Sequence, residues 1–520
     1  MNTRLKTAAS LLLAATAILA PAATAQSICT LSDSETCTVE SLTPSEDDGS
    51  VLIYPGGDTR CAFDDYQDTV TTYSANSTYF FQVFPNEELD KSKLMIFFQG
   101  GGACADQDTC AFGLQCSLGA SATFTTVATS SSAGVLNRSL ESNMFKDWNI
   151  VFIPYCTGDI HIGNRVTAAY ESGIEVLLGN PQCLGLDYAM HMNGYNNTMA
   201  VLNWALENYP DVDNLIVGGE SAGSLGAQVH STHIAEMWDV EAKGARFSVL
   251  ADSYVGVVPE DHPAATLLDY YGACENDFGL PGDIVAACEA ETATTTEMVE
   301  SLLEAEPQGN WLFINSKGDE TQRYFYALVD EGILGYPFSN LISVDDFYGN
   351  MSAILDAYQT VSTRVTTFYV DGTQHVFLAD STFASYESDE GLLLGDVINE
   401  WLVSNSSLSP ATTPAPTTDT PVATTATPTT TTAAPSTTTA TPTTTTTAPG
   451  TTTSPSTTTS PSTTTSPSTT TSPSTTTSPS TTTSPSTTTS PSTTTAPSST
   501  TTTTPSATTT TTTTTAPLAC

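Results

Sequence analysis

Basic residues are scarce in this chain. Its 520 residues include 13 Lys and Arg against 56 Asp and Glu, which gives a formal net charge of −43. Almost all of this excess lies before residue 405, since Asp419 is the one charged residue that follows. Nucleic-acid binding requires a basic surface, so the composition predicts no nucleic-acid partner. The simplest role of the charge is solubility in a saline or acidic medium.

Long hydrophobic runs are absent after the first 25 residues, so the sequence predicts no transmembrane segment. Arg4 and Lys6 precede an apolar stretch at 11–19, and Ala23-Thr24-Ala25 follows as a small-residue cleavage site. This pattern is typical of a secretory signal peptide. We therefore expect residues 1–25 to be removed and the mature protein to be secreted, either extracellular or associated with a cell wall.

The 11 cysteines lack the paired C-x-x-C spacing of zinc sites, so the sequence predicts no metal cluster. Cys520 stands at the end of the chain, and the other ten form an even set. In an exported chain such a set predicts up to five disulfides. Five sequons for N-glycosylation are also present, at Asn76, Asn137, Asn196, Asn350 and Asn405.

The composition changes abruptly at Asn405. From 405 to 520 the chain consists almost entirely of Thr, Ser, Pro and Ala, with too little apolar surface to offset chain entropy. This predicts a disordered, mucin-like tail, and dense Ser and Thr favour O-glycosylation. The tail is either a spacer or wall tether, or an extension without a specific partner. We expect residues 26–404 to form one folded domain, and the protein to be a monomer.

Short apolar runs recur through the folded part and predict strands buried on both faces of a sheet. These runs are 79–84, 94–98, 150–153, 215–217, 247–250, 311–314 and 365–370. Helical patterns at 198–207, 222–238 and 392–403 lie between or after them. The alternation predicts an α/β fold with a mostly parallel sheet flanked by helices, and a site at the carboxyl ends of the strands.

The motif Gly219-Glu220-Ser221-Ala222-Gly223 stands at the junction of a predicted strand and a predicted helix. A serine between two glycines at such a bend is typical of a nucleophile elbow, because the bend demands unusual backbone angles and close packing. The start of the helix then offers N–H groups to a developing oxyanion. The motif predicts a serine hydrolase with Ser221 as the nucleophile.

A serine nucleophile needs a base and an acid that orients the base. Three histidines follow Ser221, and His375 is the best base because it lies in a turn-like loop after the strand at 365–370. His233 lies on the helix after the elbow, and His262 has no strand directly before it.

Two carboxylates could orient the base. Asp319 follows the strand at 311–314 and is favoured, although Glu320 is its neighbour. Asp252 follows the strand at 247–250 and is the alternative, with a structural role as hydrogen-bond acceptor favoured for it.

A glycine-rich loop follows the strand at 94–98, with the sequence Gln99-Gly100-Gly101-Gly102-Ala103-Cys104. Consecutive glycines let backbone N–H groups approach a substrate closely, and one such donor contributes about 3 kcal/mol to a transition state. The segment does not match a phosphate-binding loop, because no Lys-Ser/Thr pair follows the glycines. We expect it to form an oxyanion hole together with the amide of Ala222.

Several of these segments together resemble the pectin acetylesterase family, which also contains the animal Notum carboxylesterases. The segments are Gln99–Cys104, Tyr155-Cys156-Thr157-Gly158-Asp159, Gly219–Gly223, Asn315-Ser316 with Asp319 and Gln322, and His375. They run in order between about Cys61 and Leu402. Plant members carry an aromatic residue and a cysteine where this chain has Ala103 and Val376, so it is closer to the microbial branch.

The resemblance implies an α/β-hydrolase fold and a carboxylesterase that uses no cofactor. It implies Ser221, Asp319 and His375 as the triad, and Gly101 and Ala222 as oxyanion donors with Gly102 beside them. It also implies the disulfides Cys104–Cys110 and Cys156–Cys183. The substrate expected from it is an acetyl ester on a cell-wall polysaccharide, with pectin first. The alternatives are removal of longer acyl chains, and a catalytically idle surface module on a mucin-like stalk.

Overall fold

The computed structural model describes residues 26–67, 74–106, 133–167, 187–262, 264–335 and 338–404, with residues 109, 127, 129, 170 and 171 between them. The predicted signal peptide, the predicted tail, Cys110 and Cys183 lie outside these residues.

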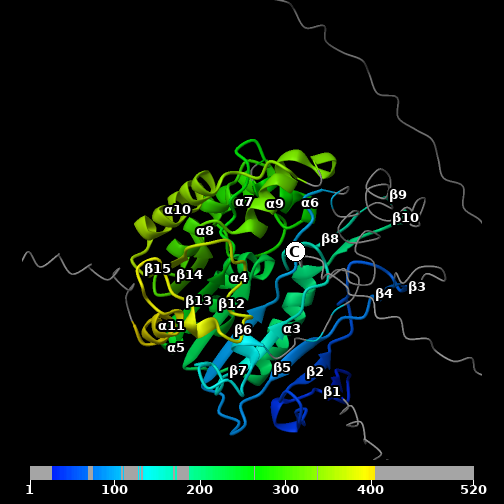
Figure 1. Cartoon of the computed structure of the whole chain (residues 1–520). Coiled ribbons are helices and arrows are strands. Elements are labelled where there is room, and N and C mark those ends of the chain that lie inside the picture. Colours follow the sequence, from blue (N-terminus) through cyan, green and yellow to red (C-terminus); the bar gives the residue numbers. More distant parts are fainter. Residues whose placement is uncertain are drawn as a thin grey trace, which may run out of the picture. The chain divides into compact units, whose positions relative to one another are not determined.

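A nine-stranded sheet forms the centre of the described part of the chain (Figure 1). Its strand order is β1-β2-β5-β7-β6-β12-β13-β14-β15. The strands are β1 (Ile28–Thr30), β2 (Val51–Tyr54), β5 (Phe81–Phe84), β6 (Lys93–Phe98), β7 (Asn149–Ile153), β12 (Asn214–Glu220), β13 (Arg246–Asp252), β14 (Asn310–Ser316) and β15 (Val365–Val370). β5 is antiparallel to both of its neighbours, and the other pairs are parallel. The predicted mostly parallel sheet is confirmed.

All seven strands predicted from apolar runs are present in this sheet. β1 and β2 were not predicted, because they are short and only β2 is buried. Short antiparallel pairs, β3 (Tyr66–Gln67) with β4 (Ser74–Ala75), β8 (Arg165–Val166) with β11 (His191–Met192), and β9 (Tyr170–Glu171) with β10 (Asp187–Tyr188), lie outside it.

Helices cover both faces of the sheet. They are α3 (Gly194–Asn208), α4 (Ala222–Trp238), α5 (Val240–Lys243), α6 (Ala264–Tyr271), α7 (Gly282–Glu289), α8 (Thr295–Ala305), α9 (Glu320–Glu331), α10 (Val344–Val361) and α11 (Leu394–Val403). Residues of α3, α4, α8 and α10 share one buried cluster with the strands, and α11 belongs to the cluster on the opposite face. The three helices predicted from sequence correspond to α3, α4 and α11.

The central strands are apolar at nearly every position because both faces are covered. In β6, Leu94, Ile96 and Phe98 belong to the cluster with α3 and α4, whereas Met95 and Phe97 belong to the cluster with α11. All five side chains are at most 2% exposed. Burial on both faces explains why near-continuous apolar runs identified these strands.

Three disulfides join described cysteines: Cys29–Cys37, Cys61–Cys156 and Cys274–Cys288. The expected pair Cys156–Cys183 is therefore wrong, because Cys156 bonds to Cys61. The two segments lie side by side, with the amide of Ala62 donating to the carbonyl of Cys156 at 2.9 Å.

The expected pair Cys104–Cys110 stays a prediction. Cys104 is disulfide-bonded, but Cys110 lies outside the described residues.

No helix within the described ranges is long and apolar enough to span a bilayer.

Removing the Cys61–Cys156 bond should destabilise the protein more than removing Cys29–Cys37. The bonds close loops of 95 and 8 residues, and the chain-entropy relation gives about 4–5 kcal/mol for the long loop against about 2–3 kcal/mol for the short one. Urea unfolding of the two double Cys→Ala variants measures the difference. Equal losses, or a Cys156–Cys183 peptide in an unreduced digest, would contradict this pairing.

Candidate active site

Ser221 occupies a strained bend between β12 and α4. Its backbone has φ +52° and ψ −123°, a conformation that a residue with a side chain rarely adopts and that costs about 1–3 kcal/mol. The Ser221 amide donates a 2.8 Å hydrogen bond to the carbonyl of Asp252 at the end of β13. The residue remains partly exposed. This is the geometry of a nucleophile elbow.

The glycines around Ser221 are required by close packing. A Cβ atom on Gly223 would lie 2.2 Å from the carbonyl oxygen of Phe98, and one on Gly219 would lie 2.2 Å from that of Gly223. On Gly100, a Cβ atom would lie 2.9 Å from Cβ of Ser221. The glycine-rich loop after β6 therefore packs directly against the elbow.

This contact places the predicted oxyanion residues beside the serine. Gly101 and Gly102 directly follow Gly100, and Ala222 is the first residue of α4. Gly102 has φ +76°, which favours glycine. Both segments begin at the carboxyl ends of the adjacent parallel strands β6 and β12.

A second segment, residues 155–161, makes hydrogen bonds with the glycine-rich loop. Nε2 of His161 lies 2.8 Å from the carbonyl oxygen of Gln99, and the side chain of Gln99 accepts a hydrogen bond from the Tyr155 amide. The Cys104 amide donates to the carbonyl of Gly158. Burial lowers the pKa of His161 to about 4, so the ring is neutral here. The segment 155–161 thus fixes both ends of the loop.

His375 and Asp319 are in contact. Nδ1 of His375 lies 2.8 Å from Oδ2 of Asp319. Asp319 is fully buried and caps α9, where its carboxylate also accepts bonds from the amide and the side chain of Gln322, both at 2.9 Å. A carboxylate only accepts, so this contact assigns the proton to Nδ1 and leaves the lone pair on Nε2.

Nε2 of His375 is buried and has no hydrogen-bond partner among the described residues. The hydrogen bond to Ser221 that general-base catalysis needs is therefore not made in this structure. Such bonds are often long or misaligned without substrate.

The other candidates from the sequence have different surroundings. Glu320 is exposed at the start of α9, and the Asp252 carboxylate binds backbone amides rather than the imidazole. Nδ1 of His262 lies 3.2 Å from Oδ1 of Asp261, and both side chains are exposed to solvent.

Glu220 is a residue of the site that sequence reasoning missed. It precedes Ser221, and its Oε2 is buried without a hydrogen-bond partner among the described residues. Burial, together with the nearby charge of Asp252, raises the pKa of Glu220 to about 7, although a hydrogen bond from the Gly100 amide opposes the rise. Its place in the elbow motif was the only available signal.

Two groups of potential metal ligands exist within the described ranges. One is Cys29, Glu35 and Cys37, whose sulfurs form a disulfide, and the other is the largely exposed group Asp261, His262 and Asp330. Neither includes a residue of the Ser221 site.

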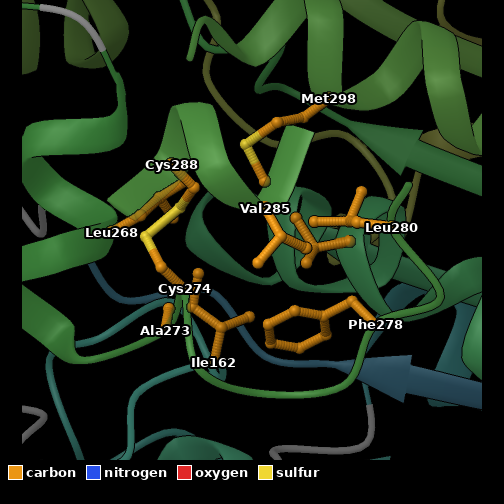
Figure 2. A pocket seen from close by; sticks show the side chains of 10 residues that line it. Ile162, Leu268, Ala273, Cys274, Phe278, Leu280, Val285, Cys288 and Met298 are labelled. Carbon is orange, nitrogen blue, oxygen red and sulfur yellow. A yellow bond between two sulfur atoms is a disulfide. The ribbon is translucent and has the colours of Figure 1, made fainter. Parts of the chain in front are cut away.

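A small apolar cavity lies apart from these residues. Figure 2 shows it beside the Cys274–Cys288 disulfide, with Leu268, Phe278 and Met298 on its walls. Its volume is about 10 Å³ and its lining is apolar. A space of this size holds at most about one water molecule and offers no polar partners for one, so it is a packing defect rather than a substrate pocket.

Comparison with known protein families finds a match. The model of the family described as Pectinacetylesterase matches residues 74–258. No curated protein matches the chain. The matched segment includes the glycine-rich loop, Ser221 and Asp252, whereas Asp319 and His375 lie beyond it.

Replacing Glu220 with Gln should give a stability difference that depends on pH. The folded-state pKa is raised from 4.5 to about 7, so the wild type is most stable relative to the variant below pH 4.5. It loses this advantage as the pH rises from 4.5 through 7, because the unfolded chain releases the proton freely whereas the folded protein must keep it or bury a charge. The difference in unfolding free energy, Glu220→Gln minus wild type, should therefore rise by about 3 kcal/mol between pH 4.5 and pH 8.

Urea unfolding at several pH values measures this difference. Glu320→Gln, which removes an exposed carboxylate one residue from Asp319, is the matched control and should track the wild type. A constant difference for Glu220→Gln across the pH range would show that its carboxyl group is not buried as described.

Proposed function

Since residues 74–258 place this chain in the pectinacetylesterase family, we propose that it is a serine carboxylesterase with Ser221, His375 and Asp319 as its catalytic triad. The observation that carries the proposal is the 2.8 Å contact between His375 and the buried Asp319. It fixes the imidazole at the same sheet edge as a strained serine in an elbow motif. Nucleophilic ester hydrolysis requires this set of groups.

The reaction has two halves. Nε2 of His375 takes the proton from Oγ of Ser221 while Oγ bonds to the acyl carbon, and the resulting tetrahedral oxyanion is stabilised by amides of Gly101 and Ala222, with Gly102 adjacent. Collapse of this species breaks the ester bond, and His375 gives its proton to the departing alcohol oxygen. Water then attacks the acyl-enzyme through the same base, which releases the acid and regenerates Ser221. No cofactor takes part.

Asp319 acts throughout as the orienting group. Its bonds to Gln322 hold the carboxylate still, and its negative charge stabilises the imidazolium that forms in both halves.

The proposed substrate is an O-acetyl ester on a cell-wall polysaccharide, with pectin first. The family description supports this class. The net charge of −43 opposes a polyanionic chain, but salt at physiological strength screens the repulsion beyond about 8 Å. The described disulfides support an exported protein that works outside the cell.

Ser221→Ala should lower the turnover of p-nitrophenyl acetate by about 10⁴-fold or more, because the nucleophile is lost while the fold remains. Ser224→Ala, in the first turn of α4, is the matched control, since Ser224 is buried and its hydroxyl donates to the Tyr254 carbonyl. A fluorophosphonate probe should label the wild type and the control but not Ser221→Ala. Full activity in Ser221→Ala would refute the assignment, and absence of labelling in the wild type would favour an idle module.

A series of p-nitrophenyl esters from acetate to octanoate tests which acyl chain length the enzyme prefers. An acetylesterase should have its highest kcat/KM for acetate, because a small site rejects longer chains sterically. A maximum at octanoate would instead indicate a deacylase for long-chain esters, as in the Notum branch. Acetate release from acetylated pectin, xylan and chitin then identifies the polysaccharide.

A further inference from the structure

The position of His375 raises a geometric problem. His375 follows β15, whereas Ser221 follows β12, and β13 and β14 lie between these strands. Neighbouring strands are about 4.8 Å apart, so the ends of β12 and β15 are separated by about 14 Å. The loop that carries the base must therefore turn back across two strands to reach the nucleophile.

Asp252 and Ser253, directly after β13, hold this loop. Oδ2 of Asp252 accepts hydrogen bonds from the amides of Phe377 and Leu378, at 2.8 and 2.7 Å. Oγ of Ser253 accepts the amide of Val376 at 2.9 Å and donates to Oδ1 of Asp252 at 2.7 Å. The three consecutive amides that follow His375 are thus bound by two adjacent side chains.

The same aspartate also holds the nucleophile. Its carbonyl oxygen accepts the amide of Ser221 at 2.8 Å. Asp252 is fully buried, and the positive φ of Ser253 (+61°) and Val376 (+65°) marks strained backbone on both sides of the contact. Strain of this kind persists only where the surroundings over-determine it, and it concentrates at functional sites.

We propose that Asp252 is the positioning residue of this enzyme, which ties the loop of the general base to the nucleophile elbow. The proposal rests on the proposed function and adds a residue outside the triad. Asp252 does not touch the imidazole or the substrate, and it acts by fixing where His375 lies relative to Ser221. A buried carboxylate is costly unless amides or other donors bind it, and here the donors belong to the segment that must be placed.

Asp252→Ala and Asp252→Asn separate this role from simple packing. Alanine removes both acceptors, and a displacement of about 1 Å in the base costs about 10²-fold in rate. We expect kcat for p-nitrophenyl acetate to fall about 100-fold in Asp252→Ala with KM unchanged. Asparagine keeps one oxygen that can accept both loop amides, so Asp252→Asn should retain most of the activity.

Asn149→Ala is the matched control. Asn149 is also buried, and its side chain accepts a hydrogen bond from the Asn86 amide and donates to two carbonyls. It lies at the amino end of β7, whereas Ser221, Asp252 and His375 lie at or beyond the carboxyl ends of their strands. Urea unfolding should show comparable destabilisation in Asn149→Ala and Asp252→Ala, and Asn149→Ala should keep its kcat. Equal loss of kcat in both variants would mean that general destabilisation explains the effect, and the proposal would fall.

A double-mutant cycle with His375→Ala completes the test. If Asp252 acts through His375, then Asp252→Ala should cost nothing further once the imidazole is gone. Independent, multiplying losses would overturn the positioning role. Full activity of His375→Ala would instead overturn the proposed triad, so the failures of the two proposals are distinguishable.

Discussion

The strained backbone of Ser221 is the constraint on which the rest of the site depends. A serine stays at φ +52° only because its amide is bound by Asp252 and its neighbour Gly223 is packed against the Phe98 carbonyl. Those contacts also fix the glycine-rich loop, since Gly100 would collide with Ser221 if it carried a side chain. Backbone contacts between β6, β12 and β13 therefore set both the backbone angles of the proposed nucleophile and the position of the proposed oxyanion donors.

The sequence predicted the parts of this arrangement that depend on burial and strand order. The apolar runs of β12, β14 and β15 were recognisable because both faces of each strand are covered. Because these strands are parallel, the loops that follow them all begin at the same end of the sheet. Ser221, Asp319 and His375 each stand in such a loop, so their proximity was a reasonable expectation. β1 was not predicted because its three residues are exposed or half-buried and too few to give a periodic signal.

Pairings between distant segments could not be predicted in the same way. Cys156 bonds to Cys61, 95 residues away, because the two segments run side by side, and no local spacing encodes that contact. The choice between Asp252 and Asp319 depends likewise on the path of the loop after β15. Both aspartates follow a strand, but the loop presents its imidazole to Asp319 and its backbone amides to Asp252.

Three carboxyl groups near Ser221 illustrate a division of labour that residue type alone does not reveal. Asp319 is bound by Gln322 and faces the imidazole, Asp252 binds the loop behind the imidazole, and Glu220 accepts the amide of Gly100 in the glycine-rich loop. Burial of acidic groups is unfavourable unless donors meet them. Each of these groups binds a different part of the proposed site, namely the proposed base, the loop behind it or the glycine-rich loop. Because burying them without donors would be unfavourable, these carboxyl groups fix the relative positions of segments that local sequence alone does not determine.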